Sequence, residues 1–359
     1  MHKTSLALAA AFACGGALAQ SSVTMFGIVD LTLNQAKGSV SSKTQLTSGG
    51  YAVSRIGFRG TEDLGGGMSA GFWLEAAVNA DNGQGSMTNT NNQANGAVAA
   101  AAGQQGLTFN RRSTVSLAGK WGEIRLGRDI TPQGWNHSSY DPFIVGVGTS
   151  QVYIGSAGLH APTGGSSGPN TRASNTIGYH LPTGLGGFFG QFMHYRGENA
   201  SNVATADDGT GNQIRLGYAS GPIHTALVLS RTKYAAGDFT TANMGGTYNF
   251  SVAKLWAAVD SDKISGGVSG KGFLVGLTMP VGSGEIRSSY SQYKTTAAGN
   301  PKSNKLAVGY VHHLSKRTNI YTTVARIKNS SVATSAFSGA VTAAGQSSTG
   351  FDIGIKHSF

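Results

Sequence analysis

Two short motifs in this chain have the residue types of a catalytic or a metal site. Residues 67–71 read Gly-Met-Ser-Ala-Gly, the G-x-S-x-G spacing that presents a serine nucleophile on a turn between a strand and a helix. Here the motif follows a glycine-rich turn and opens a segment of alternating polarity, with no helical pattern behind it. His312 and His313 are adjacent, so in a strand they point to opposite faces and cannot share one metal ion. The sequence therefore predicts no enzyme, no metal site and no cofactor.

Four arginines indicate a different chemistry, the attraction of anions. They share the polar faces of their segments: Arg55, Arg59, Arg112 and Arg172. A guanidinium keeps its proton at any working pH, and clustered like charge raises the local concentration of anions. The alternative is an ordinary solvated lining, in which Glu75, Glu123 or Asp129 pairs with these cations.

The composition narrows the class of protein. The 359 residues include 54 Gly but only 8 Pro, whereas linkers and disordered tails usually carry both. Beyond the N-terminus no stretch of 18 consecutive apolar residues occurs, so helical membrane spans are not expected. The formal net charge is +11, yet there is no Lys/Arg-rich run, so no nucleic acid is expected as a partner. The basic surplus favours anionic solutes instead.

Segments of about ten residues with alternating polarity recur along the chain. We count sixteen of them: 23–34, 51–62, 68–79, 109–118, 121–129, 172–181, 187–196, 212–219, 223–234, 239–249, 252–262, 270–279, 284–294, 304–313, 317–328 and 348–359. Short turns and long loops alternate between them, which is typical of an outer-membrane barrel. The sequence predicts an all-β fold, a transmembrane antiparallel β-barrel of sixteen strands that occupies residues 20–359 as a single domain.

The distribution of charge within the segments supports this interpretation. In the third segment Phe72 and Leu74 share one face, and Trp73 and Glu75 share the other. A Lys or Arg that faces lipid at mid-bilayer costs roughly 2–4 kcal/mol, so a lipid-facing wall requires charges to lie on the opposite face. The aromatic residues that this test places in the lumen are Trp73 and Trp256, too few to indicate a defined solute site.

The connection 130–171 is too long for a simple turn. It is rich in Gly and Ser and shows neither helical nor strand periodicity, and inserts of this kind are usually functional or disordered. Asp129 ends the lumen face before it, and Arg172 begins the lumen face after it. We expect this loop to fold inward and narrow a pore. Asp141 is expected on the loop side of that constriction, with a turn cap as the alternative.

The N-terminus has the pattern of a secretory signal peptide. Lys3 precedes an apolar run over residues 6–18, and Ala17-Leu18-Ala19 matches an A-x-A cleavage site, so residues 1–19 are expected to be removed. Cys14 is the single cysteine and lies in this segment, so the mature chain is expected to hold neither disulfide nor thiolate metal site.

Seven stretches carry a more specific resemblance. They are residues 23–30 (VTMFGIVD), 54–65 (SRIGFRGTEDLG), 110–113 (NRRS), 122–128 (GEIRLGR), 141–143 (DPF), 314–318 (LSKRT) and 354–359 (GIKHSF). With these stretches the chain resembles the trimeric general porins of Gram-negative bacteria, particularly the beta-proteobacterial type. The resemblance implies a homotrimer in the outer membrane, among lipid and lipopolysaccharide, with the third external loop inside the lumen. Phe359 resembles the signal read by the outer-membrane assembly machinery, and its alternative role is that of an aromatic girdle residue.

The function implied by the resemblance is passive diffusion of small hydrophilic solutes, here with a preference for anions. Such porins set basic wall residues against an inward loop, and the constriction residues expected here are Arg55, Arg59, Arg112 and Arg172 on the wall, Asp129 at the end of a lumen face, and Asp141 on the loop side. Relatives often carry an Arg where this chain has Gly178, which weakens the basic cluster. Two alternatives remain: a substrate-selective channel, or a non-channel barrel. The latter would be an adhesin acting through loops such as 80–108 and 329–347, or a hydrolase with a Ser/His/acid set that the sequence does not show.

Overall fold

The computed structural model describes residues 22–94, 106–150, 170–330 and 332–359. The predicted signal peptide, residues 1–19, lies outside the described residues, as do residues 151–169 of the predicted inward loop. Within the described ranges, no helix has both the length and the apolar character needed to cross a membrane.

The described elements are strands and one short helix. Their bounds are β1 (Ser22–Lys37), β2 (Ser42–Ser48), β3 (Arg55–Gly65), β4 (Met68–Asn79), β5 (Gln84–Gly85), β6 (Arg112–Gly119), β7 (Gly122–Ile130), α2 (Pro132–Ser139), β8 (Arg172–His180), β9 (Phe188–Tyr195), β10 (Gly211–Ser220), β11 (Ile223–Thr232), β12 (Phe239–Asn249), β13 (Lys254–Ile264), β14 (Ser269–Val281), β15 (Gly284–Thr295), β16 (Lys302–His313), β17 (Thr318–Ser330) and β18 (Ser347–Ser358).

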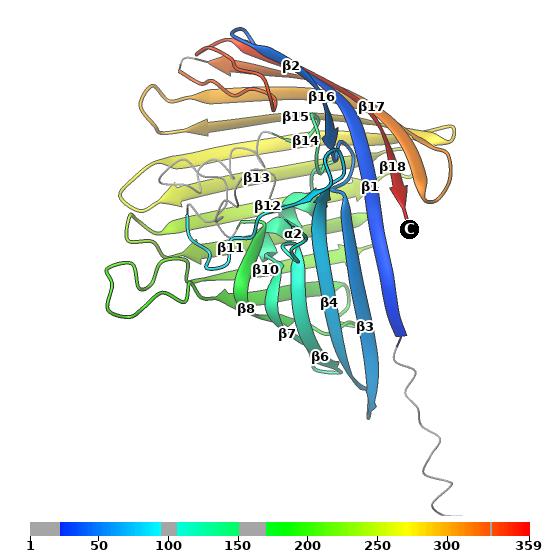
Figure 1. Cartoon of the computed structure of the whole chain (residues 1–359), viewed down its shortest axis with the longest axis vertical. Helices are drawn as coiled ribbons and strands as arrows, with labels where there is room; N and C mark the ends of the chain where they lie inside the picture. Colours follow the sequence, from blue (N-terminus) through cyan, green and yellow to red (C-terminus); the bar gives the residue numbers. More distant parts are fainter. Residues whose placement is uncertain (1–21, 95–105, 151–169, 331) are drawn as a thin grey trace, which may run out of the picture.

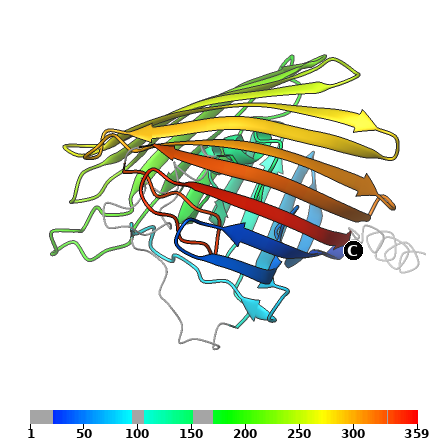
Figure 2. The same cartoon turned by 90° about the horizontal axis from the view of Figure 1, so that it is seen from above.

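Sixteen of the strands form one antiparallel sheet that closes into a barrel. β1 pairs with β3 on one side and with β18 on the other, and each remaining strand pairs with its neighbours along the chain (Figures 1 and 2). The other two strands are additions: β2 pairs with the second half of β1, and the two-residue β5 pairs with the end of β4. The predicted barrel of sixteen antiparallel strands is confirmed.

The predicted segments lie close to the observed strands, and two of them, 68–79 and 239–249, coincide with β4 and β12. The clearest error is the segment 51–62, because β3 begins only at Arg55. The backbone before it turns into the barrel, where the N–H groups of Tyr51 and Ala52 donate to Asp30 Oδ2 at 2.9 and 2.6 Å. Local alternation could not show this, because the bend is held by a carboxylate from β1.

The two faces of the wall differ as the polarity pattern requires. Leu126 and Leu306 point outward and are 45% and 55% exposed, whereas Asp129 and Lys305 point inward and are 1% and 2% exposed. A β-bulge interrupts the pairing of β7 with β8 between Gly127 and Asp129. Gly127 has a φ of +122°, and a Cβ there would lie 2.1 Å from the Ser113 carbonyl oxygen, so glycine is required at the bulge.

The loop that follows β7 begins with a helix that the periodicity analysis missed. Thr131 is the N-cap of α2, its Oγ1 accepts a hydrogen bond from the Gly134 N–H at 3.0 Å, and Pro132 takes the first helical position. A helix of eight residues is too short to show a period of 3.6. The Thr-Pro pair was the local signal that could have revealed it.

Candidate functional site

The described first part of the long loop, residues 131–150, lies inside the barrel. α2 contacts the inner faces of β9, β10, β11 and β12 (Figure 1). Asn136 Nδ2 donates to the Ala226 carbonyl at 3.1 Å and to Asn243 Oδ1 at 2.9 Å, and Arg215 Nε donates to Asn136 Oδ1 at 2.6 Å. Asn136 is fully buried, so these bonds fix the helix against the wall.

After α2, the loop up to residue 150 runs along the inner wall to β16 and β18. Lys305 Nζ donates to the Thr149 carbonyl at 2.6 Å, and the Val147 N–H donates to Asp352 Oδ2 at 3.2 Å. Val147 belongs to a buried apolar cluster, together with Ala36, Phe143, Ala307, Ala325, Ile327 and Phe337. The loop is therefore held by apolar packing as well as by polar contacts.

Asp141 holds the shape of this loop. Its Oδ1 accepts the Phe143 N–H and its Oδ2 accepts the Ser150 N–H, both at 2.8 Å. The side chain is buried, and burial raises the pKa of the Asp141 carboxyl to about 6. These contacts fit the turn-cap interpretation of Asp141; they do not place its carboxylate opposite the arginines.

The opposite wall carries the predicted arginines in two ion-pair clusters. In the first, Glu75 on β4 accepts from Arg55 on β3 at 3.4 Å and forms a short ion pair with Arg111, which precedes β6. Trp73 Nε1 donates to the other Glu75 oxygen at 3.0 Å. Arg172 Nε donates to the Arg111 carbonyl at 2.9 Å, which joins β8 to the same cluster.

The second cluster surrounds Asp129, at the end of β7. Arg112 Nε lies 3.5 Å from Asp129 Oδ1, and Arg125 Nη1 lies 3.3 Å from Asp129 Oδ2. Arg125 also bonds both oxygens of Glu123 at 2.8 Å. The carboxylates that the sequence offered as alternative partners are thus bound to arginines, so each guanidinium here is positioned as well as charged.

The structure brings together most of the predicted wall residues. Arg55, Arg112, Arg172 and Asp129 lie at the level where the long loop leaves the wall. Arg59 lies four residues further along β3, toward the short turn that ends at Met68.

Two basic residues of this wall were missed by the sequence analysis. Arg111 precedes its strand, so alternation does not apply to it. Arg125 shares the lumen face of Glu123 and could have been found. Arg125 is also paired across β7 and β8 with Gly178, and a Cβ at Gly178 would have no heavy atom closer than 3.8 Å. Arg125 of the neighbouring strand is therefore the residue directly beside the open position at Gly178.

The far wall adds one more basic residue, Arg287 on β15. Its Nη1 donates to the Pro142 carbonyl at 3.2 Å, its Nη2 donates to the Tyr51 hydroxyl at 2.9 Å, and its guanidinium lies 4.5 Å from the Tyr51 ring centroid. Arg287 also forms a short ion pair with Glu285. This residue ties the bend before β3 to the inward loop.

The lumen holds more aromatic rings than the alternation of polarity places there. Besides Trp73 and Trp256, the rings on its inner side or on the inward loop include Phe26, Tyr51, Tyr140, Phe143, Phe189 and Tyr321. Several come from irregular backbone or from strand ends, where alternation is a poor guide.

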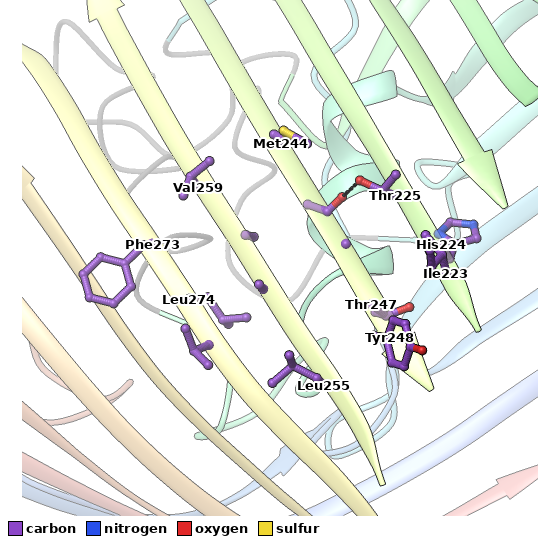
Figure 3. Close-up of a pocket in the computed structure, with 15 residues that line it drawn as sticks. Ile223, His224, Thr225, Met244, Thr247, Tyr248, Leu255, Val259, Phe273 and Leu274 are labelled. Carbon is purple, nitrogen blue, oxygen red and sulfur yellow. Dashed lines mark hydrogen bonds between the residues drawn. The ribbon is translucent and has the colours of Figure 1, made fainter. Parts of the chain in front are cut away.

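An apolar hollow lies elsewhere, on the outer face of β11 to β14. Met244, Leu255, Val259 and Phe273 line it and are 36–56% exposed (Figure 3). Its surface is almost wholly apolar, as a lipid-facing wall requires, so it is not suited to a hydrophilic solute.

The remaining motifs lie in ordinary strand contexts. Ser69 is in β4, paired with Ala118 of β6, and the chain after it continues as a strand to Asn79 rather than turning into a helix. His312 contacts Ser283, and His313 contacts Asn319. Among the described residues, no group of three or more His, Cys, Asp or Glu side chains is placed to hold a metal ion.

Both the sequence and the fold of this chain are similar to those of known proteins. The profile of a family described as Gram-negative porin matches residues 5–332. Outer membrane porin protein 32 of Delftia acidovorans is 37% identical over 380 residues, covering both chains completely. The solved anion-selective porin from Comamonas acidovorans is 34% identical, with a TM-score of 0.81 over 95% of this chain and 100% of its own. OmpT of Vibrio cholerae, in trimer form, shares the fold at 12% identity, with a TM-score of 0.65 over 94% of this chain and 99% of its own.

Proposed function

The chain belongs to the Gram-negative porin family and forms a channel in the outer membrane, and we propose that this channel favours small anions over cations. The observation that carries the proposal is the excess of arginine where the long loop leaves the wall. Four arginines (Arg55, Arg111, Arg112 and Arg125) pair with three carboxylates (Glu75, Glu123 and Asp129), and a fifth, Arg172, bonds the Arg111 carbonyl beside them. The similar Comamonas protein, itself described as anion-selective, supports the proposal.

The mechanism follows from the arrangement of charge. A small hydrophilic solute would enter from the side of the long loops and pass between the inward loop and the arginine wall. The carboxylates hold the guanidiniums in place without cancelling them, so a positive surplus remains along the path. In a narrow space with low-dielectric walls such a surplus raises the local concentration of anions and lowers that of cations.

The test is the reversal potential of the purified protein in a planar lipid bilayer under a KCl gradient. We expect a potential of the sign that chloride permeation gives. A potassium-selective reversal potential would contradict the anion preference, and absence of conductance would contradict the channel function itself.

Other parts of the proposal concern maturation and assembly. Residues 1–19 act as a cleaved signal peptide, residues 20–359 form one barrel domain, and three chains assemble as a homotrimer among lipid and lipopolysaccharide. Phe359 supports recognition by the assembly machinery, because its ring is 44% exposed while its backbone exchanges two hydrogen bonds with Gly27 at 3.0 and 3.1 Å. Asp141 keeps a role at the constriction through the loop shape that it maintains.

Gly178 offers a direct way to strengthen the basic wall. Gly178→Arg would add a lumen cation beside Arg125, and the backbone has room for the new Cβ. One extra unit charge about 6 Å from the ion path lowers an anion's energy and raises a cation's energy by about 0.7 kcal/mol each in water, so we expect about a tenfold higher anion-to-cation permeability ratio. Conductance should fall as the side chain occupies the lumen. Gly178→Ala serves as the control, and an equal change in both variants would contradict the charge mechanism.

A further inference from the structure

We propose that Arg59, stacked on the rings of Phe26 and Trp73, is a binding site for the carboxylate group of small organic anions, distinct from the ion-paired constriction. The inference rests on the proposed function, because it needs a lumen that anions enter. It adds a site with its own ligand class on the side of the short turns, which is the periplasmic side of such barrels.

Aromatic contacts hold the Arg59 guanidinium. Its central carbon lies 5.1 Å from the Trp73 ring centroid and 5.4 Å from that of Phe26. The two rings meet edge to face, with centroids 5.0 Å apart, and Trp73 is fixed by its hydrogen bond to Glu75. The ring of Phe26 passes over Gly57, where a Cβ would lie 2.4 Å from it, so the missing side chain makes room for the stack.

Arg59 differs from the arginines of the constriction in its polar partners. Arg55, Arg112 and Arg125 each bond a carboxylate, whereas within the described ranges Arg59 has no ion pair or hydrogen bond, and its side chain is exposed. Stacking uses the face of a guanidinium and leaves its N–H groups in the plane free to donate. The structure therefore presents a positioned set of parallel N–H donors, here called the donor fork, that has no hydrogen-bond acceptor among the described residues.

The location puts this fork on the solute path. Arg59 follows Arg55 by four residues in β3, which corresponds to about 13 Å along the strand. It is paired with Trp73 of β4, whose ring also lies 4.6 Å from the guanidinium of Arg112. A solute that leaves the constriction by way of Arg112 therefore meets Arg59 next.

The donor geometry selects the ligand. Two parallel N–H groups match the two oxygens of a carboxylate, and charge-assisted bidentate pairs of this kind are stronger than single contacts. Chloride is spherical and gains no such pairing. The partly exposed rings beside the fork favour an organic acid with an apolar body over a fully hydrated inorganic oxyanion.

The test measures block of the chloride current by potassium benzoate, added to one side of a bilayer that holds the purified full-length protein in KCl. We expect benzoate to block more strongly from the short-turn side than from the other, and more strongly than phosphate. Arg59→Lys keeps the charge but loses the fork, so block should weaken about tenfold while the reversal potential in KCl stays unchanged. Phe26→Leu should weaken block in the same direction, also without a change in KCl selectivity. Arg317→Lys, in an exposed turn at the same end, is the matched control.

Several results would overturn the site. One is a benzoate block of Arg59→Lys as strong as that of the wild-type protein. The others are equal block by benzoate and phosphate, and equal benzoate block from the two sides of the bilayer. A potassium-selective wild-type channel in KCl alone would instead contradict the proposed anion preference, so the two failures are distinguishable.

Discussion

The double substitution Arg112→Glu and Arg172→Glu is expected to turn the channel toward cations. Each replacement changes the local charge by two units, one cation lost and one anion gained. At about 6 Å from the ion path in water this amounts to about 1.4 kcal/mol per residue for each ion, with opposite sign for anion and cation, or about a hundredfold in the permeability ratio. Arg112 and Arg172 lie in adjoining ion-pair clusters, so together they affect the same short part of the path.

The measurement is again the reversal potential in a KCl gradient, with single-channel conductance recorded in parallel. Arg112→Gln and Arg172→Gln are the milder variants, since they remove a cation without placing a new carboxylate beside Asp129, and each should give about half the shift of its Glu counterpart. Arg231→Glu is a suitable control, because the Arg231 side chain is 67% exposed and pairs with Asp238 away from the clusters. Unchanged selectivity in the double variant would show that these arginines do not control ion passage.

The second large effect is expected from Lys305→Ala, through the anchoring of the inward loop. Lys305 is 2% exposed, bonds the Thr149 carbonyl, and lies 4.7 Å from the Phe337 ring centroid. Its charge attracts Asp141 and Asp352, which are themselves buried. Lys305→Ala leaves the buried Thr149 carbonyl without its donor and removes the cation near these carboxylates, which we expect to cost about 1–3 kcal/mol.

We expect that cost to fall on the docking of residues 141–150, because the barrel wall keeps its own hydrogen bonds. The variant should show a larger and noisier single-channel conductance, and the loop should become sensitive to protease. Lys271→Ala is the control, since Lys271 is exposed on β14. Conductance and protease resistance equal to those of the wild type would show that Lys305 does not anchor the loop.

The strand pattern could be predicted because the wall constrains every segment in the same way. An outward residue must be apolar and its inward neighbour is free to be polar, so residues such as Leu306 and Lys305 reveal their faces locally. Alternating polarity did not predict β2, because β2 depends on pairing with β1. It did not predict the bend at Tyr51 either, because the Asp30 carboxylate holds that bend. It also missed the helix α2, because eight residues inside a loop carry too little periodicity.

The candidate site likewise has one part that the sequence predicts, the face of each side chain, and one part that only the tertiary structure shows, its partners. Alternating polarity and charge alone indicate that Arg55, Arg59 and Arg112 face the lumen, because alternation assigns each side chain to a face. Alternation says nothing about partners, which are set by the register of neighbouring strands and by the bulge at Gly127. Only the tertiary structure therefore separates the arginines bound to Glu75 and Asp129 from Arg59, which rests on aromatic rings.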